Sequence, residues 1–335
     1  MRVALIGAGR IGGMHAATLR DLPEVESLLI ADADAELARS VAAAVGADVA
    51  GNVEVALKAD PDAVVIAAAT AAHPELVHLA LDAQLPVFCE KPVAPDVLGT
   101  REVIAHVVAS GAPLHVGFQR RFDAGYRTVR EAVRSGRLGW LHTLRACTSD
   151  PAPPAASYLP GSGGIFRDCL VHDFDAIRWV TGREVTEVYA TGGNKGDPCF
   201  LEADDVDTAA AVLTLDDGTL ATVTATRYNG AGYDVRLEAC GSRGSVAAGL
   251  DGRTPLGSAE PGMAPMAGQP YQTFVDRFHD AYVAELRAFT EMAAGRIGSP
   301  CTAEEALEAL LVAEAAERSR RESRPVRLEE VRHAG

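Results

Sequence analysis

The sequence predicts an α/β protein with a parallel sheet in its N-terminal part and a C-terminal α/β domain that carries a large open, mainly antiparallel sheet. A length of 335 residues suits two domains better than one core. Over roughly the first 118 residues, short apolar runs alternate with helical segments, which is typical of repeated βαβ units. After Gly117 the strand-like runs lie closer together and are joined by turn-rich pieces such as Leu215-Asp216-Asp217-Gly218, which favours antiparallel pairing.

The first part of the chain alternates predicted strands and helices. Its first apolar run is continuous, as in a strand buried on both faces. We expect strands at residues 3–6, 25–31, 63–67, 87–89 and 114–116. The helices are expected from about Ile11 and over residues 35–45, 74–83 and 95–110, the last two each opened by a proline.

The second part is predicted to hold the antiparallel sheet and one strongly amphipathic helix at about residues 164–180. Strands are expected at residues 141–147, 185–190, 208–215, 220–226 and 234–239, and helices at 273–294 and 303–319. We therefore assign residues 1–120 to a first domain and 121–335 to a second, with the C-terminal helix free to pack back on the first.

Composition excludes several classes of protein. The chain is 48% hydrophobic, which indicates a globular protein, and its net charge of -15 with scattered basic residues disfavours a nucleic-acid partner. The six cysteines are far apart without a C-x-x-C pair, which argues against a zinc ribbon or a disulfide scaffold and favours the reducing cytoplasm. Apolar runs are too short to span a bilayer, and the first seven residues are typical of a strand rather than a signal peptide.

A glycine-rich turn, Gly7-Ala8-Gly9-Arg10-Ile11-Gly12, directly follows the first predicted strand and opens a helix. Glycine is needed there for the tight turn, for close approach of backbone to a pyrophosphate, and for packing of helix on strand. The helix N-terminus adds free N–H groups and a partial positive charge. This context predicts a Rossmann domain that binds a dinucleotide.

Asp32 indicates which dinucleotide is bound. It lies twenty positions after Gly12 at the end of the second predicted strand, where a carboxylate hydrogen-bonds the adenosine ribose hydroxyls. A carboxylate repels a 2′-phosphate, and the next four residues supply no cation to bind one. NAD is therefore predicted as cofactor, while Arg39 leaves acceptance of NADP open.

The segment Cys89-Glu90-Lys91-Pro92 follows a predicted parallel strand, and ligands bind outside the carboxyl ends of such strands. Among 31 Lys and Arg residues, three are lysines, and one of these falls here. A compact ammonium can donate to a substrate hydroxyl in a way that a guanidinium does not easily replace. The alternative is a surface Glu–Lys pair before a proline turn.

On the predicted helix at 164–180, Asp168 and His172 are i and i+4 neighbours, and Asp175 lies three residues further. A histidine that titrates near neutrality can accept a hydroxyl proton while hydride leaves the same carbon. The alternatives are an exposed charged face and a histidine satisfied inside an interface. A metal site of Asp168, His172 and Asp173 is a weaker hypothesis, to which His142 could contribute in space.

Taken together, these motifs resemble the Gfo/Idh/MocA oxidoreductases over essentially the whole chain. The matching segments are the glycine turn, Glu90-Lys91-Pro92, Gly117-Phe118-Gln119-Arg120-Arg121-Phe122 and the block Gly163-Gly164…Asp168…His172-Asp173-x-Asp175. The resemblance implies a Rossmann domain followed by an α/β domain whose open sheet is often used for oligomerisation. It also implies that Lys91, Asp168 and His172 match the family's catalytic trio.

Within the family the chain most resembles the inositol 2-dehydrogenases. The similar segments are Ser149-Asp150-Pro151-Ala152-Pro153-Pro154, in which Ser149 departs from Arg, together with Arg227-Tyr228, Gly232-Tyr233-Asp234 and Arg277-Phe278…Ala281-Tyr282. Gln119 stands where Asn is commoner. The resemblance implies NAD-dependent oxidation of a cyclic polyol, myo-inositol to 2-keto-inositol (scyllo-inosose). The alternatives are another sugar, glycoside or aminocyclitol as substrate, and a non-catalytic NAD-binding regulator.

The resemblance also implies the residues that contact each ligand, with no metal and with a homo-oligomeric, tetrameric or dimeric, assembly. The expected cofactor contacts are Gly7, Gly9, Arg10, Ile11, Gly12, Asp32, Thr70, His73, Glu90, Lys91 and Gln119. The expected substrate contacts are Lys91, Asp150, Tyr158, Asp168, His172 and Tyr233.

Overall fold

The computed structural model describes residues 1–262 and 268–332. The chain forms two compact units, and neither is continuous in sequence. The first comprises residues 1–119 and 280–307, and the second comprises residues 120–279 and the chain from residue 308 onward.

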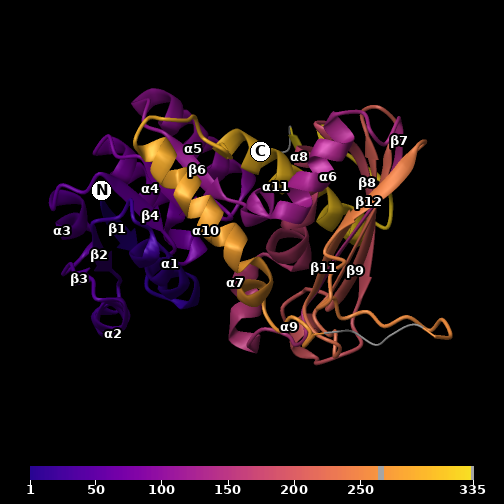
Figure 1. Ribbon diagram of the computed structural model, residues 1–335, viewed down its shortest axis with the longest axis horizontal. Helices are drawn as coiled ribbons and strands as arrows, with labels where there is room; N and C mark the ends of the chain where they lie inside the picture. Colours follow the sequence, from indigo (N-terminus) through magenta and orange to yellow (C-terminus); the bar gives the residue numbers. More distant parts are fainter. Residues whose placement is uncertain (263–267, 333–335) are drawn as a thin grey trace. The chain divides into compact units, whose positions relative to one another are not determined.

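The sheet of the first unit has six strands, all parallel, in the order β3-β2-β1-β4-β5-β6 (Figure 1). The central strand β1 is buried on both faces along residues 3–6, as its continuous apolar run predicts. The strands are β1 (Arg2–Ile6), β2 (Ser27–Ala31), β3 (Asp48–Val49), β4 (Ala63–Ile66), β5 (Val87–Glu90) and β6 (Leu114–Gly117). The predicted parallel sheet is confirmed, and the short edge strand β3 was not expected.

Helices connect these strands and begin with recognisable signals. Pro74 is the second residue of α4, whereas α5 begins after Asp96, whose carboxylate accepts from the N–H of Gly99. Pro95 thus precedes the cap, and the expectation that it opens the helix is wrong. The connecting helices are α1 (Arg10–Asp21), α2 (Ala35–Val45), α3 (Val53–Lys58), α4 (His73–Asp82) and α5 (Val97–Ser110), with a 3₁₀ turn at Thr70–Ala72.

The core of the first unit is completed from the distant C-terminal part of the chain. Leu286, Phe289 and Met292 belong to α10 (Phe274–Ala293), and all three are buried in the cluster that also contains Leu5 and Leu19. Burial of such large apolar side chains is the main stabilising contribution to the unit.

The second unit is built on a seven-stranded sheet in the order β12-β11-β7-β10-β9-β8-β13. Five of its six strand pairs are antiparallel, which confirms a mainly antiparallel sheet, and β7 and β10 pair in parallel. The strands are β7 (Leu141–Ser149), β8 (Val185–Gly193), β9 (Thr208–Leu215), β10 (Leu220–Thr226), β11 (Asp234–Gly241), β12 (Gly244–Ala248) and β13 (Val326–Arg327), of which β12 and β13 were not expected.

One face of this sheet is covered by helices and the other carries exposed side chains. Figure 1 shows α6 and α8 against one face, where the alternate residues of the strands are buried. Tyr189, Val212 and Leu220 point to the other face and are exposed. The helices that lie wholly in this unit are α6 (Ala124–Arg134), α7 (Leu159–Ser162), α8 (Val171–Thr181), α9 (Cys199–Glu202) and α12 (Leu328–Arg332). Helix α10 begins in it, and α11 (Ala303–Glu322) ends in it.

Within residues 1–262 and 268–332, every helix is too short or too polar to cross a membrane.

Candidate functional site

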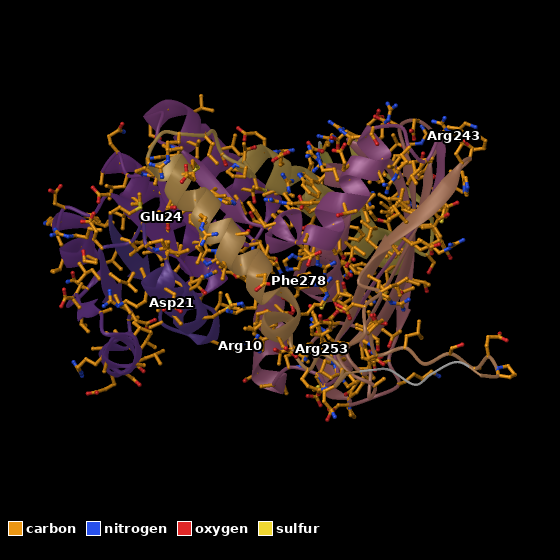
Figure 2. The ribbon with its side chains drawn as sticks, in the orientation of Figure 1. Arg10, Asp21, Glu24, Arg243, Arg253 and Phe278 are labelled. Carbon is orange, nitrogen blue, oxygen red and sulfur yellow. The ribbon has the colours of Figure 1, made fainter. Side chains whose placement is uncertain are left out.

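The glycine turn of the first unit requires its glycines. Gly7 has φ +99°, and a Cβ there would lie 2.4 Å from the backbone nitrogen of Ala68. A Cβ on Gly12 would lie 2.0 Å from the carbonyl oxygen of Gly7, whereas a Cβ on Gly9 would meet nothing within 4 Å. Gly9 caps α1 without a side-chain hydrogen bond, and Arg10, labelled in Figure 2, is the first helical residue. The turn therefore leaves open space and backbone N–H groups at a helix N-terminus, which suits a pyrophosphate.

Asp32, directly after β2, is attached to this turn. Its Oδ2 accepts from the N–H of Ala8 at 2.6 Å and its Oδ1 accepts from the N–H of Asp34 at 2.8 Å. Arg39, the cation that left NADP open, is paired with Glu36 one turn earlier on α2. The carboxylate thus lies beside the glycine turn, as the binding of a ribose requires.

The remaining cofactor residues predicted in this unit follow the carboxyl ends of three adjacent strands. Thr70 and His73 come after β4, Lys91 comes after β5, and the buried Gln119 comes after β6. In an open parallel sheet this edge is the place where ligands bind. Glu90, the last residue of β5, also belongs to this group, and its Oε1 lies 2.7 Å from Nε2 of His15.

In the second unit, three of the predicted substrate residues meet around an arginine. Arg227 donates through Nη1 to Oδ2 of Asp150 at 3.0 Å and through Nη2 to Oδ2 of Asp168 at 2.7 Å. The hydroxyl of Tyr158 donates to Oδ1 of Asp168 at 3.0 Å. These four residues are called the arginine cluster below.

The sheet explains how the arginine cluster forms. Asp150 follows β7 and Arg227 follows β10, and these two strands run in parallel with Ser149 opposite Thr226. Tyr233 precedes β11, whose Asp234 is also opposite Ser149. The ends of three neighbouring strands thus deliver Asp150, Arg227 and Tyr233 to one edge of the sheet.

Burial sets the protonation behaviour of the arginine cluster. The Arg227 side chain is 4% exposed, against 22% for Asp150 and 13% for Asp168, so a ligand meets the carboxylates rather than the guanidinium. Burial raises the pKa of Asp150, and Arg227 opposes that rise. Burial and the neighbouring Asp168 raise the pKa of Tyr158, which keeps its hydroxyl protonated as a donor. The cluster thus places one guanidinium among two carboxyl groups and a tyrosine hydroxyl.

The helix that carries Asp168 and His172 begins with a π-helical turn, Phe166–Leu170, which leads into α8. The expected helix is therefore present, but its first turn is wider than a regular α-helix. Asp168 lies in this turn and His172 is the second residue of α8. Such turns are rare and are found frequently at functional sites.

Asp175, expected on the same stripe, has a different role. It is fully buried and accepts two hydrogen bonds from Arg121, from Nε at 2.9 Å and from Nη2 at 2.5 Å. Asp173 likewise accepts from Nη1 of Arg120 and from the hydroxyl of Thr148. The two carboxylates are therefore engaged in buried pairs, and Asp175, although it lies three residues after His172 on α8, is bound to Arg121.

The same pairs disfavour the metal hypothesis, since Asp173 is occupied. His142 lies near the start of β7, with its ring against Trp140 and Nδ1 near the hydroxyl of Thr143. Eight residues of extended chain, about 26 Å, separate it from Asp150 in the arginine cluster. Across the described parts of the chain, no group of three or more His, Cys, Asp or Glu is arranged to hold a metal ion.

Arg227 is the residue of the arginine cluster that the sequence motifs did not assign to the site. Its position stood out only through resemblance, because 77 residues separate it from Asp150 and 59 from Asp168. The parallel pairing of β7 and β10 brings them together, and a sequence read as consecutive hairpins does not reveal it.

Comparison with known proteins gives matches along most of the chain. Residues 1–118 match a family model described as an oxidoreductase family with an NAD-binding Rossmann fold, and residues 126–247 match the GFO/IDH/MocA C-terminal domain.

The curated relatives are similar over nearly their whole length. The chain is 40% identical to the myo-inositol dehydrogenase Hyg17 of Streptomyces leeuwenhoekii, over 95% of this chain and 97% of that protein. It is 36% identical to the myo-inositol 2-dehydrogenase of Thermotoga maritima, over 99% of each. A solved scyllo-inositol dehydrogenase from Lactobacillus casei, with bound NAD(H) and scyllo-inositol, superposes with a TM-score of 0.89 at 27% identity, covering 98% of this chain and 99% of that one.

Proposed function

This chain belongs to the GFO/IDH/MocA family of NAD-dependent oxidoreductases, and we propose that it oxidises a ring hydroxyl of a cyclic polyol, with myo-inositol as substrate and 2-keto-inositol (scyllo-inosose) as product. The arginine cluster carries this proposal, because it presents carboxylate acceptors and a tyrosine hydroxyl rather than a cation. A polyol offers several hydroxyl donors at fixed angles, which such a surface can bind. The inositol dehydrogenases among the relatives support the same substrate class.

NAD, the hydride acceptor, fits the residues of the first unit. We propose that residues 1–120 act as its binding domain. The N–H groups at Gly9 to Gly12 would hold the pyrophosphate, and Asp32 would accept from the ribose hydroxyls. The open space above Gly9 is consistent with close approach of the phosphates.

The proton is handled by side chains of this chain. In our proposal, Lys91 donates to the reacting oxygen and stabilises the developing alkoxide, and His172 accepts the hydroxyl proton. Asp168 accepts from a neighbouring hydroxyl, and Asp150, Tyr158 and Tyr233 contact the rest of the ring. General acid–base assistance of this kind accelerates a reaction by about 10²–10⁴-fold.

Replacing His172 by alanine tests this assignment. We expect turnover of myo-inositol to fall by about 10²–10⁴-fold because the proton acceptor is lost, while NAD still binds. His142→Ala is the matched control. His142 is an exposed histidine near the start of β7, whereas the arginine cluster lies past the end of that strand. Unchanged turnover in His172→Ala would refute the role of His172.

A second candidate substrate is an aminocyclitol or an amino sugar. The composition of the arginine cluster favours it, because an ammonium group would find two carboxyl groups there as acceptors. Initial rates of NADH formation on matched cyclitols, hexoses, glycosides and aminocyclitols separate these substrates. A non-catalytic regulator is disfavoured, because Lys91, Asp168 and His172 are all present.

We also propose that the chain forms a homo-oligomer, a tetramer or a dimer, through the exposed face of the seven-stranded sheet. Tyr189 and Val212 are cross-strand neighbours on that face and are 45% and 44% exposed. Apolar patches of this kind are typical of association surfaces. Light scattering on the wild type and on Tyr189→Glu tests this face, since the charged variant would dissociate.

The cysteines support a cytoplasmic location, which we propose. Each of the six lies in the described part of the chain outside any disulfide, and four of them are buried. Free thiols persist in a reducing compartment.

A further inference from the structure

Two buried histidines from two different helices of the first unit contact the residues on either side of Lys91, Glu90 and Pro92. His15 belongs to α1, three residues after the last glycine of the turn, and its side chain is 0% exposed. Its Nε2 lies 2.7 Å from Oε1 of Glu90. The ring packs edge-on against Phe88 and Tyr282, which leaves it little freedom to reorient.

Glu90 connects this histidine to Lys91. Its second oxygen, Oε2, accepts from the backbone N–H of Lys91 at 3.2 Å. Gly117, opposite Glu90 on β6, makes room for the carboxylate, because a Cβ there would lie 3.2 Å from Oε2. The Glu90 side chain is 14% exposed, and a carboxylate so far out of water needs polar partners.

His73 holds the other side of Lys91. It is 1% exposed, with Nδ1 2.7 Å from the carbonyl oxygen of Pro92 and Nε2 3.0 Å from that of Ala68. The segment after β5 is thus tied to the segment after β4. The residues on both sides of Lys91 are fixed by groups outside their own segment.

We propose that His15 and Glu90 form a positioning pair that sets the placement of Lys91 relative to the cofactor, with His73 as the second anchor. The proposal rests on the role of Lys91 in the proposed function. A histidine that only filled the core would be replaceable by an apolar side chain of similar volume. Here the imidazole joins α1, whose N-terminus receives the pyrophosphate, to the residue before Lys91, so the same helix orients cofactor and lysine.

The kinetic test compares His15→Leu, which removes the ring nitrogens, with His15→Gln, which keeps a donor. A misplacement of about 1 Å at a reacting group costs on the order of 10²-fold, so we expect kcat of His15→Leu to fall roughly 10- to 100-fold. The dissociation constant of NAD should stay near the wild-type value, and His15→Gln should recover most of the loss. The control is His106→Leu, because His106 and Asp82 form a second, more exposed histidine–carboxylate pair in this unit, at 2.8 Å.

A second measurement does not depend on activity. The chain has three lysines, Lys58, Lys91 and Lys195, so reductive ¹³C-methylation gives three lysine signals in an NMR spectrum, and Lys91→Arg identifies that of Lys91. We expect the Lys91 signal to shift in His15→Leu and to return in His15→Gln, while the other two stay in place.

The outcomes separate the two proposals. An unmoved Lys91 signal, or equal losses in His15→Leu and His15→Gln, would overturn the positioning pair. A wild-type protein that oxidises no cyclic polyol would refute the proposed function instead, and the NMR comparison would still decide the position of Lys91.

Discussion

Arg227 and Asp168 are joined by a 2.7 Å hydrogen bond between Nη2 and Oδ2, although 59 residues separate them in the sequence. The same guanidinium binds Asp150 through Nη1. A buried cation therefore fixes the orientation of two carboxylates. In the proposed function these carboxylates bind the substrate, so its recognition would depend on a residue that itself has little exposed surface.

Removing Arg227 should affect both substrate binding and stability. In Arg227→Met two largely buried carboxylates lose their partner, so we expect the free energy of unfolding to fall by about 3 kcal/mol and KM for myo-inositol to rise. Arg227→Lys should recover little, because an ammonium does not reproduce the two-pronged contact. Urea unfolding and initial rates check this.

Arg145→Met is the control, since Arg145 forms an exposed pair with Glu238, which is worth about 0–1 kcal/mol. Equal effects of the Arg145 and Arg227 variants would contradict the special role of the arginine cluster.

The pH dependence of catalysis should move in a defined direction. Burial raises the pKa of Asp150 above its usual value of 3.8, and Arg227 holds it down by charge and hydrogen bonding. Without Arg227 the pKa rises further, so the carboxylate is protonated at a higher pH. We expect the acid limb of kcat/KM against pH to shift to higher pH in a variant that keeps its fold, Arg227→Gln. A shift to lower pH, or none, would contradict the assignment.

Two adjacent glycines offer a matched test of the turn. A Cβ at Gly12 would lie 2.0 Å from the carbonyl oxygen of Gly7, whereas the nearest atom to a Cβ at Gly13 is 3.9 Å away. Gly12→Ala should therefore weaken NAD binding strongly, measured by calorimetry. Gly13→Ala should bind normally and gain about 0.5–1 kcal/mol, because alanine is the better helix former. NAD affinity retained in Gly12→Ala would argue against this geometry.

Alanine variants of Asp32 and Asp34 distinguish an effect on cofactor choice from an effect on helix capping. Asp32→Ala removes the ribose acceptor and its repulsion of a 2′-phosphate, so the ratio of kcat/KM for NAD over NADP should fall. Asp34 caps α2 by accepting from the N–H groups of Glu36 and Leu37. Asp34→Ala should cost about 1 kcal/mol of stability and leave that ratio unchanged. If the ratio of kcat/KM for NAD over NADP changed in Asp34→Ala and not in Asp32→Ala, the assignment of Asp32 as the ribose acceptor would be refuted.

Asp175 should prove structural rather than catalytic. Its carboxylate forms a doubly hydrogen-bonded, buried pair with Arg121. Breaking such a pair typically costs 3–5 kcal/mol, so Asp175→Asn should lower the melting temperature markedly. At a temperature where it remains folded, its kcat should be close to that of the wild type. A large loss of kcat with an unchanged melting temperature would contradict this and indicate a catalytic role for Asp175.

Local signals were sufficient to predict five of the six strands of the first sheet, all but the short edge strand β3. Each of the five contains a short apolar run, and the glycine turn begins directly after β1 and leads into α1. Such features are decided by neighbours in sequence. Residues 208–215 and 220–226 were likewise predicted with their observed bounds, because alternating burial and a Gly218 turn mark them.

Contacts between distant segments were not predictable in the same way. The pairing of β7 with β10 places Asp150 beside Arg227, yet strand direction across 77 residues leaves no periodic signal. The π-helical turn at Asp168 is also hidden, since its residues fit an ordinary helical pattern. The partner of Asp175 is a further example, because spacing alone cannot show that its carboxylate binds Arg121.

The return of α10 to the first unit has a consequence for how this enzyme can be divided. Leu286, Phe289 and Met292 fill the core of the nucleotide-binding unit, but they are encoded after six of the seven strands of the second sheet. A gene fragment that ended at residue 118 would carry every glycine of the turn and lack part of its own interior. The cofactor half is therefore not a portable module, and recombination or domain grafting has to transfer both segments together.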